Sequence, residues 1–127
     1  MIEGDVALTV LPQVDGQRKS RPVVVLRKMP PFDDWLVCGI STQLHHAVEG
    51  FDDAVHVGHD DYAASGLKAS SLIRLGFLAV LPEARLLGAI GTLAPQRHRR
   101  LLDRLCEHLS AGRPENQPKQ APDTSAG

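Results

Sequence analysis

Short apolar runs rich in β-branched residues recur along most of this chain, and turn residues separate them. The run PVVVL at Pro22–Leu26 contains no polar residue, which is typical of a buried strand. Runs at this spacing predict a mainly β domain, either a small barrel or a sandwich. The strands are expected at Val6–Leu11, Pro22–Leu26, Trp35–Ile40, Ala54–Val57, Ser71–Val80 (with a bulge or bend at Gly76) and Leu86–Leu93.

One helix is expected after the last strand, because Pro95 suits a helix start and Gly112 a helix end. Apolar residues between them recur at three- and four-residue spacing, which puts them on one face. They are Leu101, Leu102, Leu105, Cys106 and Leu109. Arg97, Arg100 and Arg104 fall on the opposite side, and we expect this stripe to be a solvated face.

The segment 111–127 holds three of the nine prolines and no Leu, Ile, Val or aromatic residue. Such a segment buries too little apolar surface to offset its chain entropy. We therefore predict one folded domain over residues 1–110, followed by a disordered polar tail over 111–127.

Charge is balanced overall, with 14 Lys and Arg against 15 Asp and Glu. This balance excludes a uniformly basic nucleic-acid coat but leaves room for a local basic patch. Five cations and no acid fall within residues 18–28, whereas residues 33–61 carry seven acids and no Lys or Arg. The basic segment is the expected footprint of phosphate contacts, and the acidic one should lie away from any RNA.

A cytoplasmic protein without a membrane span is expected from the sequence. No apolar run approaches the roughly 18 residues needed to cross a bilayer, and the acidic start of the chain does not resemble a secretory signal. Cys38 and Cys106 lie in apolar stretches and are predicted to be two buried free thiols.

The histidines give only a weak metal signal. His56 and His59 have an H-x-x-H spacing, but no cysteine pair or further histidine follows or precedes them at the spacing of a zinc finger. The pair His45-His46 does not supply the missing ligands. Surface histidines are the favoured interpretation, with no metal and no cofactor. The sequence also lacks a Gly-rich phosphate loop, a G-x-S-x-G elbow and an H-E-x-x-H motif.

Two short segments could carry chemistry. Pro22 holds Arg21 extended at the mouth of a predicted strand, directly after the basic residues Arg18 and Lys19. The third predicted strand ends in Ser41-Thr42-Gln43, which offers two hydroxyls and an amide. Spacing alone favours a surface charge and a polar loop, because no charge partner can be assigned from sequence.

In order and spacing, the sequence resembles the PemK/MazF/Kid family, the toxins of type II toxin–antitoxin modules. The resemblance covers nearly all of residues 3–110. The stretches that carry it are Gly4-Asp5-Val6, DGQRKSRPVVVL at 15–26, WLVCGISTQ at 35–43, Gly66-Leu67-Lys68, SLIRL at 71–75, Leu87-Gly88 and Gly91-Thr92-Leu93 before the terminal helix.

This resemblance implies a small SH3-like twisted β-barrel plus one C-terminal helix, assembled as a two-fold homodimer. It implies metal-independent cleavage of single-stranded RNA to 2′,3′-cyclic phosphate and 5′-hydroxyl ends. It also implies an antitoxin partner that blocks the RNA groove, and operator DNA bound only through that antitoxin.

Carried over by position, Arg21 matches the catalytic arginine of the family and Ser41 matches its catalytic hydroxyl, where threonine is usual. Arg74 matches an arginine proposed to contact RNA, and auxiliary roles are expected for Arg18, Lys19, Thr42 and Gln43. One departure is clear: many members have an acid or amide two residues after the position of Arg74, and this chain has Gly76-Phe77 there.

Two alternatives stay open at this stage. The first concerns function: the chain could be a non-enzymatic interaction protein with the same fold. Such a protein would be either a gyrase-poison-like toxin or a decayed toxin that acts only with its antitoxin in operon repression. The other concerns the hydroxyl: Ser41 and Thr42 should point to opposite sides of a strand, so that only one faces Arg21. The match to the family favours Ser41.

Overall fold

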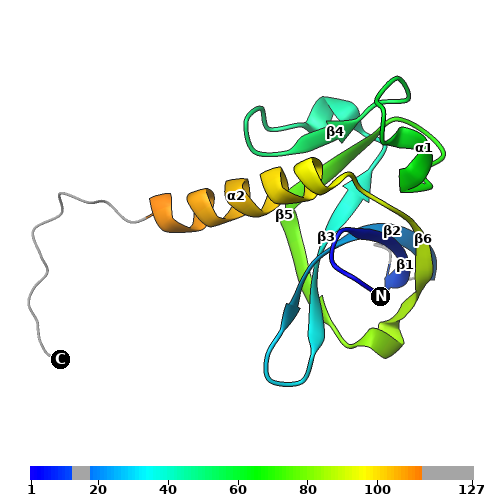
Figure 1. The fold of residues 1–127 in the computed structure, drawn as a ribbon, viewed down its shortest axis with the longest axis vertical. Helices are drawn as coiled ribbons and strands as arrows, with labels where there is room; N and C mark the ends of the chain where they lie inside the picture. Colours follow the sequence, from blue (N-terminus) through cyan, green and yellow to red (C-terminus); the bar gives the residue numbers. More distant parts are fainter. Residues whose placement is uncertain (13–17, 113–127) are drawn as a thin grey trace, which may run out of the picture.

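A computed structural model of the chain, which describes residues 1–12 and 18–112, consists of one curled six-stranded sheet and a long C-terminal helix (Figure 1). The sheet contains β1 (Asp5–Pro12), β2 (Arg18–Met29), β3 (Asp34–Ser41), β4 (Asp53–Val55), β5 (Ser71–Leu81) and β6 (Leu86–Thr92). The helices are α1 (Tyr62–Ser65) and α2 (Pro95–Ala111), with 3₁₀ turns at Leu44–His46 and Glu83–Arg85. The predicted tail lies outside the described residues from 113 onward.

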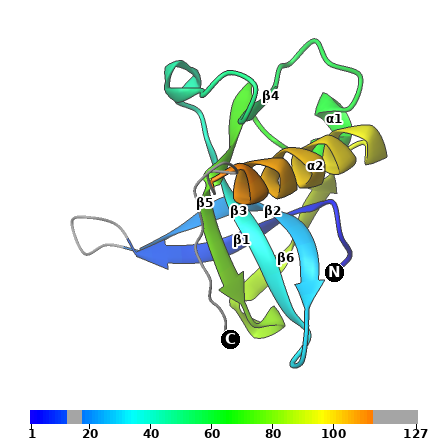
Figure 2. The same cartoon turned by 90° about the vertical axis from the view of Figure 1, so that its left-hand side faces the viewer.

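All neighbouring strands are antiparallel, in the order β4-β5-β3-β2-β1-β6. The prediction of a mainly β domain with a C-terminal helix is confirmed. The sheet is not closed into a barrel, however, because β4 and β6 remain its two edges. Figure 2 shows how strongly the sheet curls between these edges.

The helical turn α1 lies against the edge strand β6, and two glycines permit this close approach. A Cβ on Gly91 would lie 2.3 Å from the carbonyl oxygens of Ala64 and Ser65. A Cβ on Gly66 would lie 2.1 Å from the carbonyl oxygen of Ile90. The segment between β4 and β5 thus reaches across to the opposite edge of the sheet.

The central strands are buried on both faces, which explains the unbroken run PVVVL. Val24 and Leu26 belong to a core cluster that includes Leu101 and Leu105 of α2. Val23 and Val25, which alternate with them along β2, belong to a second cluster. Its other buried members are Ala7, Trp35, Val37 and Leu86. Successive side chains of a strand point to opposite faces, so both faces of a stretch that lies between two core clusters are buried. Every position of such a stretch is therefore apolar.

The apolar face of α2 is narrower than predicted. Leu101 and Leu105 are buried, but Leu109 is 67% exposed and Cys106 is also exposed. Figure 1 gives the reason, since the C-terminal half of α2 extends past the sheet. The prediction of two buried thiols is therefore correct for Cys38 and wrong for Cys106.

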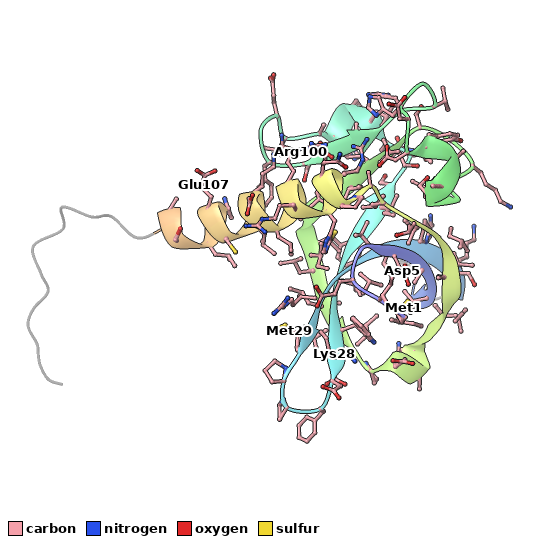
Figure 3. All side chains as sticks on the ribbon, in the orientation of Figure 1. Met1, Asp5, Lys28, Met29, Arg100 and Glu107 are labelled. Atoms are coloured by element: carbon pink, nitrogen blue, oxygen red, sulfur yellow. The ribbon has the colours of Figure 1, made fainter. Side chains whose placement is uncertain are left out.

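The arginine stripe of α2 is not a purely solvated face, and the expectation of one was wrong. Arg97 is 7% exposed, and its Nη1 donates to Asp53 Oδ2 at 2.7 Å. Arg100 and Arg104 also pair with Asp53, at 2.9 and 3.4 Å. In Figure 3 the labelled Arg100 extends from α2 toward the segment that carries β4. The stripe therefore holds α2 to the acidic segment.

Candidate functional site

A surface cavity of about 460 Å³ lies at the ends of β2, β3 and β5. Its walls come from residues far apart in the sequence, which only the sheet brings together. They are Arg21, Pro22, Gly39, Ile40, Ser41, Thr42, Gln43, Ser71, Arg74 and Phe77. The cavity therefore collects most of the residues that the sequence nominated.

The cavity opens where the ladder between β2 and β3 ends. The last pair of this ladder is Val23 with Gly39, and the same register continued by two residues would set Arg21 opposite Ser41. Between these positions stands Pro22, which has no N–H to donate to β3. The strands can separate there, and residues opposite one another in an antiparallel pair share a face. Arg21 and Ser41 both line the cavity that lies there.

A bulge in β5 supplies the third wall. Gly39 pairs with Arg74, but its neighbour Cys38 pairs with Leu78, so β5 has extra residues between them. This bulge includes Gly76, where the sequence predicted it. It begins directly after Arg74, which is half-buried in the cavity wall, and it carries Phe77 out of the ladder to the cavity.

Ser41 and Thr42 both line the cavity, although the sequence predicted that only one of them would face Arg21. Strand β3 ends at Ser41, so the alternation of a strand no longer governs Thr42. The two hydroxyls still differ in their surroundings. Ser41 is half-buried, and its Oγ accepts a hydrogen bond from the backbone N–H of Gln43 at 3.0 Å. That bond fixes the Ser41 oxygen and leaves its O–H to donate outward.

The electrostatics of the cavity favour an anion. Among the described residues that line it, two are arginines and none is acidic. The acids of the neighbouring segment are engaged elsewhere: Asp53 with the arginines of α2, and Asp52 with the backbone N–H of Leu75 at 3.1 Å. A guanidinium fork and hydroxyl donors in one cavity suit the oxygens of a phosphate group.

Some predicted residues do not join this cavity. Lys19 lies two residues before Arg21 on β2 but is not among the lining residues, and the side chain of Arg18 lies outside the described part. The sequence reasoning missed Gly39, Ser71 and Phe77. The only signal for Phe77 was that it stands near a position where the resembling family carries an acid or amide.

The histidines lie elsewhere. The rings of His56 and His59 are 5.1 Å apart, and His59 Nδ1 lies 3.1 Å from Arg97 Nη2. Within residues 1–12 and 18–112, no group of three His, Cys, Asp or Glu side chains is arranged to hold a metal ion. Burial raises the pKa of the Cys38 thiol to about 12, which keeps it protonated and unreactive at neutral pH. No helix of the described part is long and apolar enough to cross a membrane.

Comparison with known proteins gives one family and one fold. A family model described as "PemK-like, MazF-like toxin of type II toxin-antitoxin system" matches residues 2–109. Among solved structures, the Mycobacterium tuberculosis toxin MazF-mt6 is similar with a TM-score of 0.58 and 22% identity, over 84% of this chain and 96% of that one. An endoribonuclease in complex with its cognate antitoxin, from a mycobacterial species, has a TM-score of 0.65 at 14% identity, over 90% and 99% of the two chains. No curated protein sequence matches.

Proposed function

This chain belongs to the PemK-like, MazF-like toxins of type II toxin–antitoxin systems, and we propose that it is an endoribonuclease that cuts single-stranded RNA in the cavity around Arg21. One observation carries the proposal. The cavity joins two guanidinium groups with hydroxyl donors and has no carboxylate among its described lining residues, in a chain of this toxin family.

The chemistry requires little from the protein, because RNA carries its own nucleophile. The 2′-hydroxyl attacks the adjacent phosphorus, the bond to the 5′-oxygen of the next nucleotide breaks, and that oxygen takes up a proton. The products are a 2′,3′-cyclic phosphate and a 5′-hydroxyl end. The protein must align the attack and stabilise the charge on the phosphorane oxygens. Arginine and a hydroxyl donor suffice for this, so we propose that cleavage is metal-independent.

The cavity residues divide these tasks by position. Arg21 presents a fork of N–H donors that matches two phosphate oxygens, and we assign it the stabilisation of the phosphorane. Ser41 lines the same cavity, and we assign to its hydroxyl the donation of a further hydrogen bond. Arg74, Thr42 and Gln43 border the same space and are assigned to holding the RNA.

The proposed partners follow from the family. We propose a cognate antitoxin that blocks the cavity, a two-fold homodimer and a cytoplasmic location, with operator DNA bound only through the antitoxin. In support of the antitoxin, one structural neighbour was solved as an endoribonuclease in complex with its cognate antitoxin. The cationic cavity favours a partner segment that is acidic where it covers Arg21 and Arg74.

The test is primer extension on a defined single-stranded RNA with purified, antitoxin-free protein. We expect discrete cuts that persist in excess EDTA and leave 5′ ends that a polynucleotide kinase labels without prior dephosphorylation. Cuts that vanish with EDTA, or that leave 5′-phosphate ends, would instead indicate metal-dependent hydrolysis. Intact RNA with a protein that still binds its antitoxin would indicate a toxin fold without cleavage.

A further inference from the structure

An aromatic side chain lies at the proposed site with its ring partly open to solvent. Phe77 lines the cavity together with Arg21 and Arg74, and 46% of it is exposed. The exposed part of the phenyl ring forgoes the stabilisation that full burial would give it, so its place in a cationic cavity needs an explanation. Only three phenylalanines, one tyrosine and one tryptophan occur in the whole chain.

The backbone is shaped to hold this ring against the sheet. The bulge of β5 releases Phe77 from the ladder, and the ring then lies over Gly39 on β3. A Cβ on Gly39 would lie 2.6 Å from Phe77 Cδ2, closer than non-bonded carbon atoms approach. Any other residue at position 39 would therefore displace the ring.

The ring also divides two chemical environments. It borders the polar cavity and, in addition, a small recess lined only by apolar residues and Gly39. The other residues of that recess are Val23, Val37, Ala79 and Leu81. A ligand that reaches Phe77 from the arginines thus passes from charged donors to an apolar surface within one cavity.

We propose that Phe77 is a stacking platform for one of the two bases that flank the scissile phosphate. This inference rests on the proposed ribonuclease function. A nucleotide combines an anion and a planar aromatic face a few ångströms apart, which is the combination that Arg21, Arg74 and Phe77 offer. An acidic protein segment would pair with the arginines but would not require an aromatic ring packed on Gly39, so the observations favour a nucleobase.

Stacking on Phe77 also has a consequence for the substrate. A base that lies on a protein ring cannot stay stacked in a duplex, so the contact selects RNA that is already single-stranded. Stacking tolerates every base, because each has a π face. We therefore expect Phe77 to set the strength of binding near the cut more than the identity of the base.

The experiment uses a short RNA that spans one site cut by the wild-type protein, with copies in which each flanking nucleotide in turn lacks its base. Phe77→Leu keeps an apolar side chain but removes the ring, and Phe77→Trp keeps a ring. Val80→Ala is the matched control, since Val80 is 52% exposed on the same strand but is not among the cavity residues. Melting temperatures establish that each variant is folded.

We expect Phe77→Leu to lower kcat/KM roughly 5- to 100-fold, the loss typical of one stacked base, with Phe77→Trp and Val80→Ala close to wild type. Removing the base at one flanking position should slow the wild-type protein by a similar factor and leave Phe77→Leu unaffected. A binding readout is independent of cleavage. A 2′-O-methyl copy of the RNA, which has lost its nucleophile, should quench the fluorescence of the Phe77→Trp variant but not that of wild-type Trp35, which is buried.

Three results would overturn the proposal. The first is a kcat/KM of Phe77→Leu equal to that of the wild-type protein. The second is that the loss from Phe77→Leu and the loss from the missing base multiply when both changes are combined. A variant that cuts RNA normally but binds the antitoxin more weakly would show that the ring contacts protein instead. If the wild-type protein cuts no RNA, the proposed function itself fails and the stacking role fails with it.

Discussion

Arg97 binds Asp61 through a two-pronged contact, from Nε to one carboxylate oxygen at 2.8 Å and from Nη2 to the other at 2.9 Å. These hydrogen bonds, helped by one from the backbone N–H of Ala94, lower the pKa of Asp61 to about 2 against the opposing effect of burial. Since Asp61 directly precedes α1, the contact attaches the start of α2 to the segment that reaches across the sheet edge.

Acid should weaken this attachment over a defined pH range. The pKa of Asp61 is lower in the folded protein than in the unfolded chain, where it is about 4. Its contribution to stability is therefore complete above pH 4 and disappears as the pH falls toward 2. Urea unfolding at a series of pH values should show a shallower acid loss in Asp61→Asn than in wild type. The neighbouring exposed Asp60→Asn is the control, and equal slopes in both variants would contradict the assignment.

The contact between α1 and β6 predicts a strong effect of one methyl group. In Gly91→Ala the new Cβ would meet backbone atoms of Ala64 and Ser65, which can move only if α1 moves. We expect a loss of about 1–3 kcal/mol in the free energy of unfolding, as for other overpacked sites. Gly58→Ala has nothing within 4 Å of its Cβ and should change stability by less than about 0.5 kcal/mol. Equal stability of the two variants would show that α1 does not pack as described.

The two thiols should react at very different rates. Cys106 is exposed on α2 and should react with a disulfide reagent within seconds to minutes, whereas Cys38 is buried and its pKa is raised to about 12. One equivalent of reactive thiol is therefore expected in the native protein, and the second thiol should react only when the protein unfolds. Cys106→Ser should abolish the fast phase. A fast phase that survives in this variant would mean that Cys38 is accessible.

The hydroxyl pair gives a prediction within the site. Ser41 lines the cavity together with Arg21 and its oxygen is held by the backbone N–H of Gln43, whereas Thr42 lies exposed beyond the strand end. Ser41→Ala should therefore slow RNA cleavage more than Thr42→Val, and Ser41→Thr should be close to neutral. Rate constants on one defined RNA decide the order. If Thr42→Val abolishes cleavage and Ser41→Ala does not, the roles of the two residues are reversed.

Much of the fold was predictable because local patterns encode it. The run Pro22–Leu26 predicted a buried strand, Gly76 a bulge or bend in the strand that is now β5, and Pro95 the start of the helix, and all three are confirmed. The closure of the barrel was not confirmed, since β4 and β6 stay apart as edges. No sequence pattern reports whether two distant edge strands pair.

The long-range contacts of charged residues were also beyond the sequence. Arg97 has the position of a solvated residue in the helical pattern, and its partners Asp53 and Asp61 stand about 40 residues earlier. The cavity was partly predictable: Arg21, Ser41 and Arg74 were nominated by their resemblance to family positions. Phe77 was missed, because its place over Gly39 depends on how many residues the bulge of β5 adds.

Cleavage of RNA in the cavity around Arg21 is decided by the single-turnover cleavage rate of Arg21→Ala on a defined single-stranded RNA. We predict a rate roughly 10²–10³-fold below wild type, the usual loss for one electrostatic donor, in a protein with an unchanged melting temperature. Arg99→Ala removes an exposed arginine of α2 that is not among the lining residues, and this variant should cut at the wild-type rate. A folded Arg21→Ala protein that cuts as fast as wild type would contradict the account.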